Sequence, residues 1–395
     1  MDKMQTLKIS GKLAVMAMAA SVFFGLTAIA MGQSDGVRAI YLSAGNVPTN
    51  LANIHTYAEP PRAFNPLTAA DEELATYGFP TRPDKQADPD HYRLWERAMT
   101  AAKIHWQGDL KPMSRSQHGM SQAGSVPQPV EQAVHPNAGP QQWSNINAAG
   151  VILNNNLKKW NAKTSFGDIW TLISVPTVQV PFDNTTGCTE TYYFDLNYIG
   201  IDGYLAAGQS IYFNAGEQAG VQEVVNCSTG TPYYNMLVGW GDLYTTGFAL
   251  NPGDIFYTEL HAFGGCNNGS AFVEDLTTLT YSTYTIQNDC VVPQVGSRAN
   301  WVVDRLCCDG PSPNGVWPLA NTGSIFFDGG AVENQSGALF YPGSQAALTQ
   351  VLTMTDDVGD QAIELTNQGS GTGYEGEHAL FFQTTGCAWS GGCTR

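Results

Sequence analysis

Residues 299–305, Ala-Asn-Trp-Val-Val-Asp-Arg, form an apolar run that ends in a carboxylate, Asp304. β-Branched and aromatic residues dominate this run, so the sequence predicts a strand. About a dozen similar runs follow one another between residues 149 and 383, separated by turn-forming Gly, Asn, Asp and Pro. Short strands joined by turns, with no regular alternation of strand and helix, are typical of an antiparallel sandwich. We therefore expect an all-β fold, a large antiparallel two-sheet β-sandwich, preceded by a small, partly helical N-terminal region.

The first thirty residues have the features of an export signal. Three lysines precede an apolar run over residues 13–30, which ends in an Ala-Ile-Ala cleavage pattern. We expect cleavage because no basic stop-transfer flank follows. The alternative is an uncleaved membrane anchor, because the run is long enough to span a bilayer. The protein is thus expected to be secreted or extracytoplasmic, with no membrane partner after cleavage.

The rest of the chain divides into three expected segments. Residues 31–112 form a propeptide-like region with a helix at 92–105 and a shorter helix at 71–77. Residues 113–141 are rich in Ser, Gln, Gly and Pro and predict a flexible linker, and the sandwich domain covers residues 142–395. The N-terminal region could cover an acidic cleft until low pH weakens the attraction. The alternative is a tethered spacer.

Charge is divided unevenly along the chain. From residue 164 onward there are 23 Asp or Glu but only three Arg, and the whole chain carries a formal charge of −17. Such a surface repels nucleic acid, so no nucleic-acid partner is expected. It repels itself less as its carboxylates protonate, which suits acid surroundings. Solubility alone explains the charge equally well.

All eight cysteines lie in this acidic part of the chain. An even number of cysteines behind an export signal predicts disulfides, with the connectivity left open. No set of cysteines or histidines has the spacing of a metal site, and the common nucleophile, metalloprotease and phosphate-binding motifs are missing from the sequence. We therefore expect no metal and no cofactor.

Several segments carry recognisable motifs. The clearest are Ile-Gly-Ile-Asp-Gly at residues 199–203 and Glu-Asp-Leu-Thr-Thr at residues 274–278. The others are residues 60–67 with 77–80, 147–150, 173–176 and 317–327. In this order they resemble the glutamic peptidases, or eqolisins, over roughly residues 55–385. The resemblance implies a bacterial-type secreted acid endopeptidase with protein or peptide substrates, on a sandwich similar to that of lectins and glucanases.

The catalytic dyad of that family is a Gln and a Glu. The Gln follows Gly-Ile-Asp-Gly in a segment such as Ile-Leu-Gln-Thr-Gly or Val-Glu-Gln-Ile-Gly, and the Glu closes a segment such as Glu-Trp-Ile-Val-Glu. By this resemblance, Asn214 in Tyr-Phe-Asn-Ala-Gly takes the place of the Gln, and Asp304 takes the place of the Glu. Both changes keep the functional group and shorten the side chain by one methylene.

In the family's chemistry the carboxylate takes a proton from the attacking water, and the amide holds that water and donates to the oxyanion. A misplacement of about 1 Å can cost roughly a hundredfold in rate. The shortened pair therefore predicts an acid endopeptidase whose activity is weak or lost, and the alternative is a matched change that keeps activity on a bulkier substrate. The alternatives are a strand carboxylate at Asp304 that pairs with Arg305 or Arg298, and a turn residue at Asn214.

Three more residues are candidates for the site. Gln209 is a rival for the amide role, although it precedes the expected strand. Trp240 resembles an aromatic residue of the family's substrate cleft, with a core tryptophan as the equal alternative. Asp202 is a candidate substrate-binding residue or a turn-forming Asp.

The main alternative function is a non-catalytic module outside the cell that binds glycans or assembles with itself. It rests on the lectin-like architecture and on the low content of charged residues, 13%. A glycosidase on the same fold needs two carboxylates about 5–10 Å apart. Glu259 and Glu274-Asp275 are available, but no acid/nucleophile motif frames them.

Overall fold

Two antiparallel sheets packed face to face make up the computed structural model, as predicted. The structure describes residues 35–100, 103–113, 130–131, 141–145, 148–181, 188, 190–203, 216–240, 242–288, 290, 293–305, 317–342, 348–355, 361–368 and 379–384.

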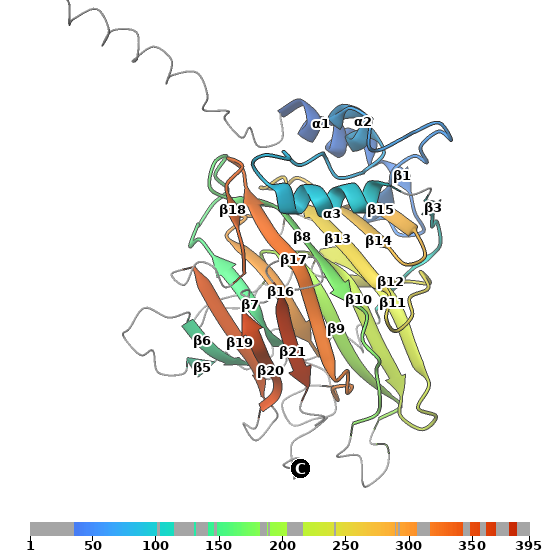
Figure 1. The fold of residues 1–395 in the computed structure, drawn as a ribbon, viewed down its shortest axis with the longest axis vertical. Helices are drawn as coiled ribbons and strands as arrows, with labels where there is room; N and C mark the ends of the chain where they lie inside the picture. The colour runs from blue at the N-terminus through green and yellow to red at the C-terminus, as the bar shows by residue number, and fades with distance from the viewer. Residues whose placement is uncertain are drawn as a thin grey trace, which may run out of the picture.

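The first sheet runs from β6 to β4 through its hydrogen-bonded neighbours (Figure 1). Its strands, in spatial order, are β6 (Gln141–Asn145), β19 (Thr349–Thr355), β7 (Ala148–Asn154), β16 (Arg298–Asp304), β9 (Tyr192–Ile201), β10 (Glu217–Asn226), β11 (Pro232–Trp240), β12 (Asp242–Thr246) and β4 (Leu110–Pro112). The short β5 (Val130–Glu131) pairs with β6.

The second sheet packs against the inner face of the first. Its strands, in spatial order, are β15 (Thr280–Ile286), β14 (Gly269–Asp275), β13 (Ile255–His261), β8 (Phe166–Ser174), β17 (Ser324–Asn334), β21 (Leu380–Thr384) and β20 (Gln361–Gln368). β18 (Leu339–Phe340) forms a hairpin with β17. β19 pairs with both β7 and β20, so it joins the two sheets along one side.

The main hydrophobic core lies between the sheets. Side chains alternate along each strand, so every second residue points inward. On β16, Ala299, Trp301 and Val303 belong to this core, together with Ile199 of β9 and Val221 of β10. Val302 belongs to a separate cluster on the outer face of the first sheet. Asn300 and Asp304 share that outer face by the same alternation.

The N-terminal region packs directly on the sandwich. It contains α1 (Asp35–Ala44), β1 (Val47–Pro48), β2 (Ile54–Thr56), α2 (Asp71–Thr76), α3 (Pro89–Met99) and β3 (Ile104–His105). In Figure 1, α3 crosses the outer face of the second sheet above β17, β8 and β13. β2 and β3 extend that sheet at β15, and β4 extends the first sheet at β12.

The two predicted helices are present, with one change of boundary. The shorter helix is confirmed as α2. The longer helix begins earlier than predicted, because Asp88 accepts a hydrogen bond from the backbone N–H of His91 and Pro89 occupies the first turn. It also ends earlier, at Met99, and the predicted helical residues Ile104 and His105 instead form β3 beside β15.

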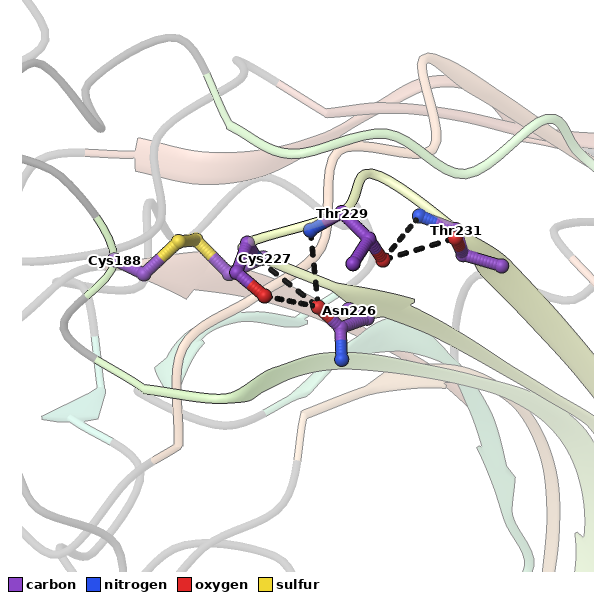
Figure 2. Close-up of a disulfide and its surroundings, with 6 residues drawn as sticks. Cys188, Asn226, Cys227, Thr229 and Thr231 are labelled. Carbon is purple, nitrogen blue, oxygen red and sulfur yellow. Dashed lines mark hydrogen bonds between the residues drawn. A yellow bond between two sulfur atoms is a disulfide. The ribbon is translucent and has the colours of Figure 1, made fainter.

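Disulfides are confirmed among the described cysteines. Cys188 pairs with Cys227, and Cys266 pairs with Cys290. Figure 2 shows the first pair beside the turn after β10, where the Asn226 side-chain oxygen accepts hydrogen bonds from Ser228 and Thr229. Cys307, Cys308, Cys387 and Cys393 lie outside the described residues.

Within the described ranges, no helix is long and apolar enough to cross a membrane. The predicted export signal lies outside those ranges, and so does most of the predicted linker.

Candidate active site

Asp304 ends β16 on the outer face of the first sheet. It lies opposite Leu196 on β9 and Ala148 on β7. Only 8% of the residue is exposed, and the hydroxyl of Tyr198 donates a hydrogen bond to its Oδ2 at 2.9 Å. This contact holds the carboxylate in one orientation on a largely apolar face.

A second polar group lies level with Asp304. The strand register places Gln222 on β10 across Leu196 from Asp304. Asn235 donates to the side-chain oxygen of Gln222 at 3.1 Å, and the Gln222 amide contacts the sulfur of Met113 at 3.8 Å. Gln222 is therefore an amide in the same row as Asp304, with one strand between them.

Two further amides flank Gly200 on the same face. Gln218 on β10 and Asn300 on β16 lie opposite Gly200 from its two sides. A Cβ at Gly200 would meet Cγ of Gln218 at 3.2 Å and Nδ2 of Asn300 at 3.5 Å. The missing side chain of Gly200 thus gives both amides their space.

Of the two polar atoms of the Asn300 side-chain amide, the nitrogen is hydrogen-bonded. Its Nδ2 donates to the backbone oxygens of Asp202, at 2.6 Å, and Gly200, at 3.3 Å. Its Oδ1 is buried and has no hydrogen-bond partner among the residues that the structure describes. A buried unpaired acceptor is costly, so this oxygen marks a place that a donor would stabilise.

Gln218 is a candidate that the sequence analysis missed. Residues 217–220, Glu-Gln-Ala-Gly, match the family segment Val-Glu-Gln-Ile-Gly at the Glu, the Gln and the Gly. They also begin the strand that follows Gly-Ile-Asp-Gly. The sequence therefore carries a match to the family segment that contains Gln, four residues after Asn214.

Gln218 and Asp304 are not direct neighbours. Gln218 is level with Asn300, which precedes Asp304 by four residues on β16. This separation is about 13 Å along the strands, with two strand spacings of about 4.8 Å across them. The rival amides Asn214 and Gln209 lie outside the described residues, so their positions stay predictions.

Asp202 holds the segment that leads into β16 through hydrogen bonds to its backbone. Its backbone has a positive φ of 62°. Its carboxylate accepts backbone N–H bonds from Val295, Gly296, Ser297 and Arg298, at 2.7 to 3.2 Å. These bonds occupy the carboxylate and favour the turn-forming alternative for Asp202 over direct contact with a substrate.

Trp240 lies at the end of β11, in the core between the sheets. It is directly opposite Glu217, while its neighbour Gly239 is opposite Gln218. Trp240 thus faces away from Asp304, which favours the core alternative.

Buried acids lie behind Asp304 on the inner face. Asp195 of β9 is directly opposite Glu223 of β10, and both are fully buried. Burial, with a contribution from Asp304, raises the pKa of Asp195 to about 8. Burial also raises the pKa of Glu223 well above its usual value, and nearby Asp195 adds to the rise. Both groups therefore carry protons in acid.

The carboxylates available to a glycosidase lie elsewhere, under the N-terminal region. Glu259 faces His91, and Glu274 pairs with Lys103. Asp275 caps the following turn by accepting from the backbone of Thr277. All three acids are buried and engaged, which argues against an acid/nucleophile pair open to a sugar. No group of three or more potential metal ligands occurs among the residues the structure describes.

Comparisons with known proteins found a matching family model and similar solved structures. Residues 147–369 match the model of the peptidase A4 family. Scytalido-glutamic peptidase with a transition-state analogue inhibitor is 16% identical at a TM-score of 0.44, covering 60% of this chain and 98% of that chain. Aspergilloglutamic peptidase from Aspergillus niger is 22% identical at a TM-score of 0.38, covering 49% and 99%. No curated protein matches the chain.

Proposed function

Because the chain belongs to the peptidase A4 family, we propose that it is a secreted hydrolase that cleaves peptide bonds in acid, with Asp304 as the base. The observation that carries this proposal is the position of Asp304, which ends β16 on the outer face of the sheet and accepts a hydrogen bond from Tyr198. A base held in this way has a fixed direction toward a water above the sheet.

An amide partner completes the proposed chemistry. Asp304 takes a proton from water as the water attacks the scissile carbonyl, and the amide orients the water and donates to the oxyanion. Within the described strands, Gln222 is the amide level with Asp304 and Gln218 is the amide that matches the family motif, and Asn214 is the candidate outside them. Asp304 later returns the proton to the leaving amine, so the enzyme ends the cycle unchanged.

We propose that this activity is weak. The arm of Asp304 is one methylene shorter than that of Glu, and Gln218 is displaced from it by about four residues along the strands. One water bridges two groups only when both are within about 3 Å of it. At this separation Gln218 does not reach a water held by Asp304, so in this arrangement the attacking water has no support from the Gln218 amide.

A non-catalytic binding function is the second candidate. Tyr192 and Tyr233 are 38% and 47% exposed, and their rings contact edge to face at 6.3 Å. Exposed, rigid aromatic pairs are typical of recognition surfaces for glycans or proteins. Binding on a glycan array that Tyr233→Ala abolishes, together with no hydrolysis, would favour this candidate over the first.

The test of the first candidate is digestion of casein between about pH 2 and 5 in the presence of pepstatin. Asp304→Ala should abolish digestion, whereas Asp90→Asn, at an exposed carboxylate on α3, should not change it. Folded protein that digests nothing over this range contradicts the proposal.

A restoration series identifies the amide. Asp304→Glu is combined either with Asn214→Gln or with the native Asn214, and Gln218→Ala is added to each. If Gln218 is the partner, Asp304→Glu alone raises the rate and Gln218→Ala removes the gain. If Asn214 is the partner, only the double variant gains activity, and Gln218→Ala has little effect on it.

A further inference from the structure

We propose that residues 35–113 are a permanent third layer of the folded protein, bound to the outer face of the second sheet and kept there in acid. This proposal is independent of the catalytic one. It contradicts the expectation that the N-terminal region is a cover released at low pH.

Backbone pairing is the first support. Ile54, His55 and Thr56 of β2 pair with β15, and β3 pairs with β15 in parallel. Lys111 of β4 pairs with Thr245 of β12. The N-terminal region thus covers one edge of each sheet, where removal would expose unpaired strands.

An apolar interface is the second support. From α3, Leu94, Trp95 and Met99 are buried against Trp170 of β8 and Phe272 of β14. The indole N–H of Trp95 donates to the backbone oxygen of Pro80 at 3.0 Å, so its polar atom is satisfied within the layer. Burial of these large apolar side chains favours association of the layer with the sheet, and this contribution does not depend on pH.

A charged cluster between α3 and the second sheet determines how the binding of the N-terminal layer changes with pH. The His91 ring stacks on Trp170 with centroids 3.5 Å apart. Its Nδ1 lies 3.6 Å from Oδ2 of Asp88, and its Nε2 lies 3.6 Å from Oε2 of Glu259. His91 is 6% exposed and Glu259 is 2% exposed, so water screens this contact poorly.

The cluster continues through a second histidine. Nε2 of His261 lies 3.6 Å from Oε1 of Glu259, and its Nδ1 lies 2.7 Å from Oδ1 of Asp168. The charged and titratable groups around His91 are Asp88 of α3, Tyr257, Glu259 and His261 of β13, Asp168 of β8, Glu333 of β17 and Tyr41 of α1.

These neighbours determine whether the contribution of His91 to stability rises or falls with pH. Burial lowers the pKa of His91, but Asp88 and Glu259 raise it more, to about 9. Burial raises the pKa of Glu259, but His91, His261 and Tyr257 hold it below its usual value. Because unfolded His titrates near 6.5, the contribution of His91 is fully present below that pH and is lost as pH rises through about 9.

Lys103 and Glu274 form a second buried ionic contact of this layer. This buried pair joins the segment after α3 to β14. Burial raises the pKa of Glu274 to about 7 despite the attraction of Lys103. Below that pH the carboxyl is neutral and still accepts a hydrogen bond from the ammonium group. Because unfolded Glu releases its proton near pH 4.5, the folded state is favoured in acid and this contribution is lost as pH rises through about 7, in the same direction as that of His91.

The test is to cut the chain between the N-terminal layer and the sandwich and to measure whether the layer remains bound. A recognition sequence for a specific protease is placed within residues 114–129 of the full chain, and the cut protein is passed over a sizing column at pH 5, 7 and 10. The N-terminal piece should co-elute with the sandwich at pH 5 and 7, and its dissociation constant should rise at least tenfold by pH 10. A piece that separates at pH 5, or that binds more tightly at pH 10, overturns the proposal.

Two substitutions and a matched control sharpen this test. His91→Gln should weaken retention about tenfold at pH 5 and flatten the change between pH 7 and 10. Arg93→Gln, in the exposed ion pair of the same helix, should behave as wild type. If His91→Gln does not fold, Glu274→Gln replaces it, matching wild type at pH 5 and binding at least as tightly as wild type at pH 8, because its side chain stays neutral. Wild-type pH dependence in His91→Gln, or loss of retention at pH 5 in Glu274→Gln, refutes the mechanism.

Discussion

At the scale of single residues, Tyr198 and Asp304 form the smallest unit on which the proposed chemistry depends. Tyr198 comes from β9 and Asp304 from β16, and their rows are offset by two residues. The hydroxyl reaches diagonally across the two strands to the carboxylate. A hydrogen bond to an ionised carboxylate stabilises the charged form and lowers its pKa.

Replacing Tyr198 with Phe should therefore shift the acid limb of the pH–rate profile upward. Loss of one donor raises the pKa of the Asp304 carboxyl, so less of the base is ionised at any acid pH. The measurement is casein digestion from about pH 2 to 6 for both proteins. An unchanged acid limb with a lower plateau would mean that Tyr198 acts only through packing.

At the scale of elements, β10 shows why part of the site escaped prediction. Apolar runs that predict strands lie on both sides of residues 217–226, at 191–201 and 233–238, but residues 217–226 do not form such a run. Its inward positions hold Glu217 and Glu223 among apolar residues, and its outward positions hold Gln218 and Gln222. Buried polar groups on both faces hide the alternation that predicts a strand. β16 was predicted because its polar residues are confined to one face.

The disulfide that follows β10 should contribute strongly to stability. It links Cys188 to Cys227 across 39 residues, a span that includes both β9 and β10. Closing a loop of this length stabilises the fold by about 4 kcal/mol in the chain-entropy model. Replacing both cysteines with Ser should lower the free energy of unfolding in guanidinium chloride by about 2–4 kcal/mol. A change below about 0.5 kcal/mol would contradict this expectation.

At the scale of the whole molecule, the sequence predicted an acid-adapted surface but not an acid-adapted interior. The excess of Asp and Glu was visible, whereas the burial of several of them required the fold. Burial raises the pKa of Asp195 and of Glu333 to about 8 and that of Glu274 to about 7. Burial also places the pKa of Glu217 well above its usual value. These positions depend on long-range strand pairing, which residue spacing does not encode.

The fold should therefore be more stable at pH 5 than at pH 8. Unfolded carboxyls release their protons near pH 4, whereas the buried ones keep theirs to about 7 or 8, so the free energy of unfolding falls as pH rises between these values. His91 acts in the same direction, because its charge is lost through about pH 9. The melting temperature should drop by on the order of 10 °C from pH 5 to pH 8. Replacing Asp195 with Asn and Glu223 with Gln should reduce this drop, because the pair no longer ionises. A melting temperature that rises from pH 5 to pH 8 would show that surface charge and not the buried acids controls stability.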